Sequence, residues 1–272
     1  MKAVLRKGER VHRARYVSGM SPDGQDPAVP TLPHGDPLAG ELVATIHRGD
    51  LEALRALLDA NPDLARVRMI GRHGPAGGWR SPLHVTADWP GYFPEAPAAV
   101  QILVAAGGDP NVDTGGDRPE TPLHWAASSD DREVALALID AGADLERPGG
   151  SIGSPLDNAI GYGCWHVARL LVERGAAVNV PWHAAALGDL DRLGELLEHK
   201  PDEYEISKAF WHACSGAQRR AAELLLAHGA DLNWVPDYAE GTPLDSASGT
   251  GTRRENVIRW LRDLGARSSH TP

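Results

Sequence analysis

The chain has 272 residues, a formal net charge of −10, 42% apolar residues and a mean hydropathy of −0.32. These values are ordinary for a soluble protein, and no apolar run approaches the ~18 residues that a membrane-spanning helix needs, so we expect no membrane partner. An acidic chain repels phosphate backbones, which argues against a nucleic-acid partner.

The start of the chain differs in composition from the rest. Residues 1–20 hold six basic residues and one acidic residue, a balance of +5, and residues 22–37 are rich in Pro, Gly and Asp. We therefore predict an N-terminal extension over residues 1–36, made of a basic tail and a linker. The tail is interpreted as a flexible terminus, and its docking on the acidic body is left open.

A motif of about 33 residues recurs along the rest of the chain. Its clearest forms are "SPLHVTADWPG", "TPLHWAASSDD", "SPLDNAIGYGC" and "TPLDSASGTGT". The copies begin at Gly40, Ser81, Thr121, Ser154, Trp182, Lys208 and Thr242, and those at Gly40 and Trp182 are degenerate. We therefore predict about seven repeats within residues 37–268, with residues 269–272 as a tail.

Each repeat is predicted to form a helix, a turn, a second helix and a hairpin. Ser or Thr supplies the N-cap, and Pro follows at the first helical position, where a missing N–H has no cost. In the second helix, apolar residues such as Val134 and Leu138 recur at helical spacing. Gly142, Gly175 and Gly229 then follow at the position where a positive φ ends a helix.

Taken together, these signals resemble the ankyrin-repeat family, in a bacterial type with a single solenoid. The resemblance implies an all-α fold, an ankyrin-repeat solenoid of about seven helix-turn-helix units joined by short hairpin loops. It also implies that His84 and His124 have a structural duty, because the family's histidine at this position bridges the backbones of adjacent repeats.

The second repeat carries an insertion. It takes 20 residues from Ala87 to Gly107, where other repeats take 15, and the five added residues fall within the stretch "DWPGYFPEAP" at residues 88–97. Three prolines stiffen it and three aromatic residues give it a large apolar area. This aromatic loop is interpreted either as a wall of a binding cleft or as a cover packed over the helices beneath it.

The resemblance also indicates candidate binding residues, because partners of ankyrin repeats mostly meet the concave side. Carried onto this chain, those positions and their neighbours are His47, Arg48, Trp79, Arg80, Asp88, Trp89, Tyr92, Arg118, Glu120, Ser128, Ser129, Asp130 and Tyr162. Arg80 and Asp88 are predicted to pair with each other when no ligand is bound. Trp125, Trp182 and Trp211 are assigned to packing between repeats.

The predicted function is an interaction module that binds a protein or peptide partner on the concave face of its first four repeats. The alternative is a small-molecule-binding or catalytic protein with a cleft walled by the aromatic loop. The sequence has no zinc, phosphate-loop or nucleophile-elbow motif, so we predict no metal and no cofactor, and we favour a non-enzymatic role.

The expected setting is a monomer in the cytoplasm. Cys164 and Cys214 are the two cysteines, and no metal-type spacing relates them. The basic start "MKAVLRKGER" has no apolar stretch behind it, so we expect no secretory signal.

Overall fold

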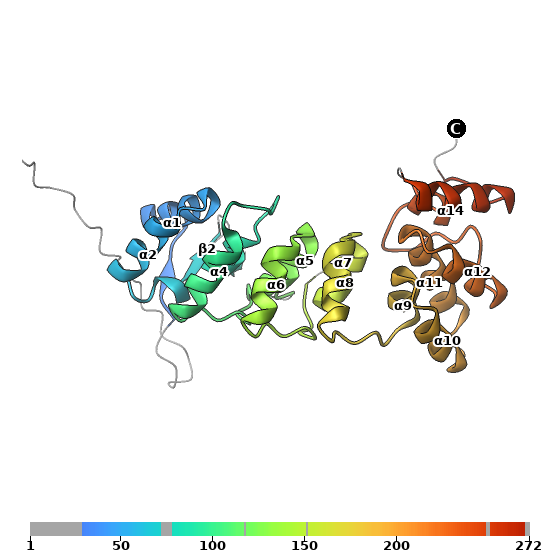
Figure 1. Cartoon of the computed structure of the whole chain (residues 1–272), viewed down its shortest axis with the longest axis horizontal. Helices are drawn as coiled ribbons and strands as arrows, with labels where there is room; N and C mark the ends of the chain where they lie inside the picture. Colours follow the sequence, from blue (N-terminus) through green and yellow to red (C-terminus); the bar gives the residue numbers. More distant parts are fainter. Residues whose placement is uncertain (1–28, 72–77, 117, 151, 249–250, 270–272) are drawn as a thin grey trace, which may run out of the picture. The chain divides into compact units, whose positions relative to one another are not determined.

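The computed structural model describes residues 29–71, 78–116, 118–150, 152–248 and 251–269. Two compact units divide the chain, Met1–Ser151 and Ile152–Pro272, called here the N-terminal unit and the C-terminal unit. Within each unit the helices follow one another in pairs, as Figure 1 shows. The predicted all-α repeat fold is confirmed, and the basic tail over residues 1–20 lies outside the described residues.

The N-terminal unit holds three helix pairs and three short strands among its described residues. Its elements in chain order are β1 (Thr31–Leu32), α1 (Pro37–Arg48), α2 (Leu51–Ala60), the 3-10 turn η1 (Leu64–Arg66), β2 (Arg68–Ile70), β3 (Trp79–Arg80), α3 (Pro82–Thr86), α4 (Ala96–Ala105), α5 (Pro122–Ser129) and α6 (Arg132–Asp140).

In the C-terminal unit the described elements are all helices. They are α7 (Pro155–Gly161), α8 (Trp165–Glu173), α9 (Pro181–Leu187), α10 (Leu190–Glu198), α11 (Glu203–Ser215), α12 (Arg219–Ala227), α13 (Pro243–Ser246) and α14 (Thr252–Asp263).

The predicted helix boundaries have the expected local causes. Ser81, Thr121, Ser154 and Thr242 are N-caps, and each forms a capping box with the residue three positions later and precedes a proline at the first helical position. The predicted helix-ending glycines have φ angles of 91° at Gly142, 99° at Gly175 and 95° at Gly229.

Side chains in the first helices also tie neighbouring repeats together. Nε2 of the fully buried His84 lies 2.9 Å from the Glu120 carbonyl oxygen, so the predicted bridging role of this histidine is confirmed. In the C-terminal unit, Trp211 makes an equivalent bridge, because its indole Nε1 donates to the Gly241 carbonyl at 3.1 Å. Glu120 and Gly241 each immediately precede the N-cap of the next first helix.

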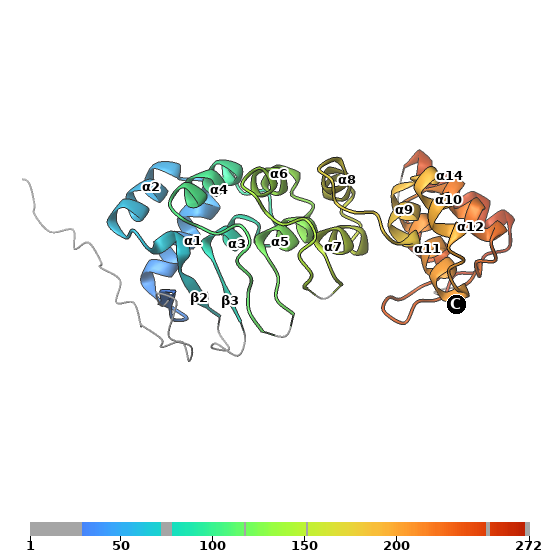
Figure 2. The same ribbon diagram turned by 90° about the horizontal axis from the view of Figure 1, so that it is seen from below.

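The strands β2 and β3 belong to a hairpin that extends to one side of the helices of the N-terminal unit, as Figure 2 shows. Thr31 of β1 pairs in parallel with Arg68 of β2, and Met69 of β2 pairs antiparallel with Arg80 of β3. The segment around β1 was predicted from the sequence to be a linker, and this pairing attaches it to the repeats. The domain boundary at residue 36 stays a prediction.

Candidate functional site

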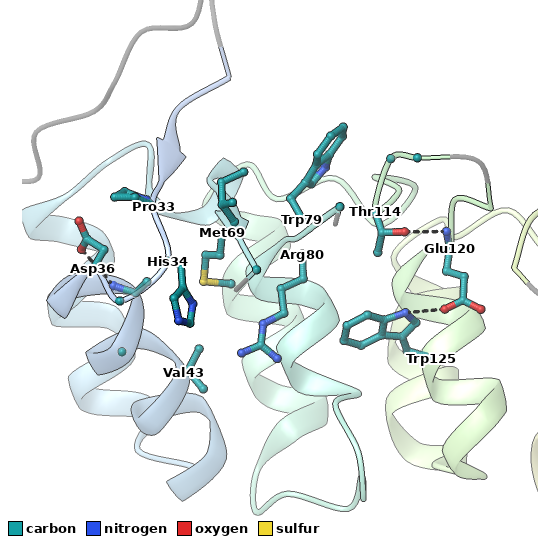
Figure 3. Close-up of a pocket in the computed structure, with 18 of the residues that line it drawn as sticks. Pro33, His34, Asp36, Val43, Met69, Trp79, Arg80, Thr114, Glu120 and Trp125 are labelled. Atoms are coloured by element: carbon teal, nitrogen blue, oxygen red, sulfur yellow. Dashed lines mark hydrogen bonds between the residues drawn. The ribbon is translucent and has the colours of Figure 1, made fainter. Parts of the chain in front are cut away.

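A groove of about 1050 Å³ lies between α1 and the hairpins of the N-terminal unit. Helix α1 contributes Gly40, Val43 and His47 on one side, and the segment that precedes this helix adds Pro33, His34 and Asp36. The other side is formed by β2, β3, the next hairpin and Trp125 of α5. Figure 3 shows the labelled side chains around this space.

The α1 side of the groove is built by a helix start. Oδ1 of Asp36 accepts from the Leu38 backbone N–H at 2.9 Å, and Pro37 occupies the first helical position. The pairing of β1 with β2 brings this segment beside the second repeat's hairpin. Pro33 and His34 are therefore held at the groove from two sides. The pairing of β1 precedes them, and the helix cap at Asp36 follows them.

The opposite wall is a series of backbone bonds between neighbouring hairpins. The Trp79 N–H donates to the Thr114 carbonyl at 3.0 Å, and the Thr114 N–H donates to the Glu120 carbonyl at 3.0 Å. The Trp79 ring lies against Gly115, where an added Cβ would collide with it, and the Arg68 guanidinium sits 4.5 Å from the ring centroid. Trp79 is thus held in place by contacts on both sides.

Trp125 completes the groove beneath the hairpins. Its Nε1 donates to Oε2 of Glu120 at 2.9 Å, and the imidazole of His84 meets its ring edge-on at 4.9 Å between centroids (Figure 3 labels Trp125 and Glu120). The side chain packs between repeats, as predicted, and it also lines the groove. Trp125 is not among the candidate binding residues predicted from the sequence.

A polar cluster lies where α1 meets the second repeat. The predicted pair of Arg80 and Asp88 is present, with Nη1 donating to Oδ2 at 2.5 Å. Nε2 of His47 lies 3.7 Å from the same carboxylate oxygen. Burial lowers the pKa of His47, while Asp88 acts in the opposite direction and Arg80 adds to the lowering. The His47 ring is therefore favoured in its neutral form.

The aromatic loop is fixed to its neighbours on both sides. The Phe93 ring stacks on His47 of α1 with 3.9 Å between centroids. On the side of the third repeat, the Tyr92 N–H donates to Oδ2 of Asp131 at 2.6 Å, and its hydroxyl donates to the Asp130 carbonyl at 2.5 Å. Phe93 thus packs as a cover over α1, and the loop braces three successive repeats.

Comparison with known proteins identifies repeats within this fold. The family model described as "Ankyrin repeats (3 copies)" matches residues 83–181. Residues 83–181 of this chain contain ankyrin repeats. The match covers three copies, so the total number of ankyrin repeats stays a prediction.

Solved ankyrin-repeat structures are similar to the chain as well. The human ASB11 ankyrin repeat domain is 25% identical over 69% of this chain and 85% of its own length, with a TM-score of 0.41. The ankyrin repeat domain of Bcl-3, a unique member of the IkappaB protein family, is 24% identical over 82% of this chain and 97% of its own, with a TM-score of 0.46. A search of curated protein sequences finds no match.

The fold brings some of the candidate residues together and leaves others apart. The candidates that line the groove are His47, Trp79, Arg80, Arg118 and Glu120. Asp88 joins them through its ion pair with Arg80. Outside the groove lining are Arg48, Trp89, Tyr92, Ser128, Ser129 and Asp130, and Tyr162 lies in the C-terminal unit.

Three of these outlying candidates have plain structural surroundings. The Ser128 hydroxyl donates to the His124 carbonyl at 2.9 Å, and the Ser129 hydroxyl donates to the Trp125 carbonyl at 3.1 Å. Both serines therefore bond to carbonyls of their own helix. Trp89 is 78% exposed and faces solvent rather than the groove lining.

The structure adds groove residues that sequence reasoning missed. The main ones are His34, Asp36, Val43, Met69 and Trp125. Asp-Pro at residues 36–37 is an N-cap signal that could have placed the start of α1 and its neighbours. The two-residue strand β1 carries no such signal, because its pairing with β2 depends on contacts distant in sequence.

Across the residue ranges that the structure describes, no three His, Cys, Asp or Glu side chains converge closely enough to hold a metal ion. None of the helices in the same ranges combines the length and the apolar character needed to cross a membrane.

Proposed function

We propose that the N-terminal unit is a protein-interaction module whose groove binds a peptide segment of a partner protein. Ankyrin repeats generally mediate contacts between proteins, and their stacking creates extended binding surfaces. The observation that supports this site is the groove of about 1050 Å³, which runs from α1 past two hairpins. The proposal assigns the binding face to the first three repeats.

The size of the groove favours a peptide segment. Pockets for small molecules usually measure about 300–1,000 Å³ and enclose most of the ligand, and the volume of this groove lies just above that range. Its walls come from backbone turns and separate side chains of three repeats. A segment with several side chains can use that length, whereas a compact molecule would occupy only part of it.

The groove residues match those that dominate protein interfaces. Tryptophan and arginine are enriched among residues that contribute most to binding, and the groove presents Trp79, Trp125, Arg80 and Arg118. The Arg80–Asp88 pair is partly exposed, so it contributes only ~0–1 kcal/mol to stability. A carboxylate of the partner can therefore replace Asp88 beside Arg80 at little cost to the fold.

A small organic molecule is the second candidate ligand. The observation that favours it is the convergence of His47, Arg80 and Asp88 at one part of the groove, because few and closely placed polar groups are typical of small-molecule sites. In a thermal-shift screen of small organic acids, a ligand that raises the Tm of the wild type and does not raise the Tm of a groove-filled variant would support this candidate.

The groove can be filled without disturbing its walls. Gly40 lies on α1 in the groove lining, and an added Cβ there meets no atom within 4 Å. Gly194 on α10 of the C-terminal unit is equally open and serves as the matched control. We expect that Gly40→Trp blocks the groove and Gly194→Trp does not, while both variants retain the helical circular dichroism of the wild type.

The test compares the proteins captured by the full chain and by these two variants. Proteins retained by the wild type and Gly194→Trp and lost with Gly40→Trp are the expected partners. If both variants capture the same proteins at the same yield as the wild type, the groove is not the binding face. We propose that the chain is a monomer in the cytoplasm, so that no second copy covers the groove. Size-exclusion chromatography with light scattering tests whether it is a monomer.

A further inference from the structure

The C-terminal unit carries an exposed aromatic surface that the groove does not explain. Tyr204 lies in the first turn of α11, and Trp234, Val235 and Tyr238 lie on the loop that follows α12. Tyr204 is 46% exposed, Val235 49% and Tyr238 49%. The Trp234 ring contacts Tyr204 at 5.4 Å and Tyr238 at 6.4 Å between centroids. These four residues are called the aromatic patch.

The backbone segments that carry the aromatic patch are strongly acidic. Residues 202–207 and 231–240 contain six carboxylates and no Lys or Arg: Asp202, Glu203, Glu205, Asp231, Asp237 and Glu240. The Tyr204 hydroxyl donates to Oδ1 of Asp237 at 3.4 Å, which places a carboxylate beside the rings. The pKa of Tyr204 is raised, by burial and then by Asp237 and Asp202.

One ring of the patch, Tyr238, and the neighbouring Trp182 ring already face one ammonium group from within the unit. Nζ of Lys208 lies 4.6 Å from the Trp182 ring centroid and 5.5 Å from that of Tyr238. Both distances are within the range of a cation–π contact. Burial lowers the pKa of Lys208, while Asp157, Asp237 and Glu205 oppose the lowering. The patch therefore combines ring faces and carboxylates in an arrangement that attracts cations.

We propose that the aromatic patch is a second interaction surface, which binds an arginine- or lysine-bearing segment of a partner protein. Guanidinium and ammonium groups stack on aromatic faces and pair with carboxylates, and the patch offers both within one surface. The carboxylates repel nucleic acid and anionic lipid headgroups. Charge complementarity thus selects a cationic partner. The patch also exposes tyrosines, a residue type that is enriched among those contributing most to protein interfaces.

The direct test uses a fluorescein-labelled nonapeptide of three Gly-Arg-Ser units and its twin with glutamate in place of arginine. Fluorescence anisotropy with the full chain should show binding of the arginine peptide at least tenfold tighter than that of its twin. Val235→Lys places a cation in the patch and should weaken binding at least fivefold, and Val235→Glu should strengthen it. Both changes lie at a half-exposed side chain, so the fold should persist.

A matched control separates the patch from the overall charge. Leu264 is 47% exposed in the same unit, and Leu264→Lys changes the net charge as Val235→Lys does. Binding that is unaffected by Leu264→Lys and weakened by Val235→Lys supports the proposal. Equal weakening by the two variants, or no preference for the arginine peptide, would overturn it.

Two other occupants give distinct results. If changing Lys7, Arg10 and Arg13 together to Gln in the full chain tightens peptide binding, the chain's own basic segment occupies the patch, and the proposal of a partner is wrong. If sedimentation shows a dimer that Val235→Lys dissociates, the patch binds a second copy, and the proposal is again overturned. An unchanged affinity and a monomer support the proposal.

Discussion

Replacing His84 with Ala should destabilise the N-terminal unit strongly. The imidazole is fully buried, its Nδ1 accepts from the Ser81 N–H at 3.1 Å, and its Nε2 faces the Glu120 carbonyl at 2.9 Å. The Ser81 N–H would lose its partner, which costs about 1–3 kcal/mol for a buried group, and the ring would leave a cavity. The Glu120 carbonyl would lose the imidazole and keep its bond from the Thr114 N–H. We expect a loss of about 3–5 kcal/mol in the free energy of unfolding.

Urea denaturation followed by circular dichroism measures this change, with His34→Ala as the control. His34 is an exposed side chain, so its removal should alter stability by no more than about 0.5 kcal/mol. Hydrogen exchange should also accelerate at the Thr114 amide, which bonds to the Glu120 carbonyl. If the free energy of unfolding of His84→Ala is less than 1 kcal/mol below that of the wild type, the bridge between repeats does not hold the groove wall.

Three other predictions concern pH and packing. Burial lowers the pKa of His84 to about 4 from 6.5, so the contribution of the neutral ring to the free energy of unfolding is complete above pH 6.5 and is lost toward pH 4. Urea titrations should therefore give a free energy of unfolding about 2 kcal/mol lower at pH 5 than at pH 7. Equal stability at pH 7 and pH 5 would contradict this. Gly115→Ala should lower the Tm more than Gly116→Ala, because both positions have positive φ and only the first would collide with a ring; a smaller effect at Gly115 would refute the contact. Trp211→Phe should cost about 1–3 kcal/mol by leaving the Gly241 carbonyl without its donor, and a neutral substitution would show that the bridge is dispensable.

Local signals explain what could be predicted of the fold. The caps at Ser81 and Thr121 and the positive φ of Gly142 depend on residues that are close in sequence, so a single chain reveals them. The pairing of Arg80 with Asp88 was also predictable, because both lie next to one short first helix. In each case the interaction spans fewer than ten residues.

The groove could not be predicted in the same way, because it depends on contacts between distant segments. Residues 33–36 read as a linker by composition, and only the pairing of β1 with β2 places them at the groove. The aromatic loop suggested a cleft wall, yet Phe93 stacks on His47 and the hairpins form the groove's walls. The same limit applies to Trp211, which makes the bridge that histidine makes in the second repeat.

The most direct test of the proposed binding face is residue-level cross-linking in the full chain. A photoreactive benzoylphenylalanine at Arg118, on the rim of the groove, is compared with one at Gln101, an exposed position on α4 outside it. We expect cross-links from position 118 to one defined segment of a partner protein. These cross-links should be lost in the Gly40→Trp background, and none of them should form from position 101. Cross-links of equal yield to the same segment from both positions, or cross-links from 118 that persist with Gly40→Trp, would contradict it.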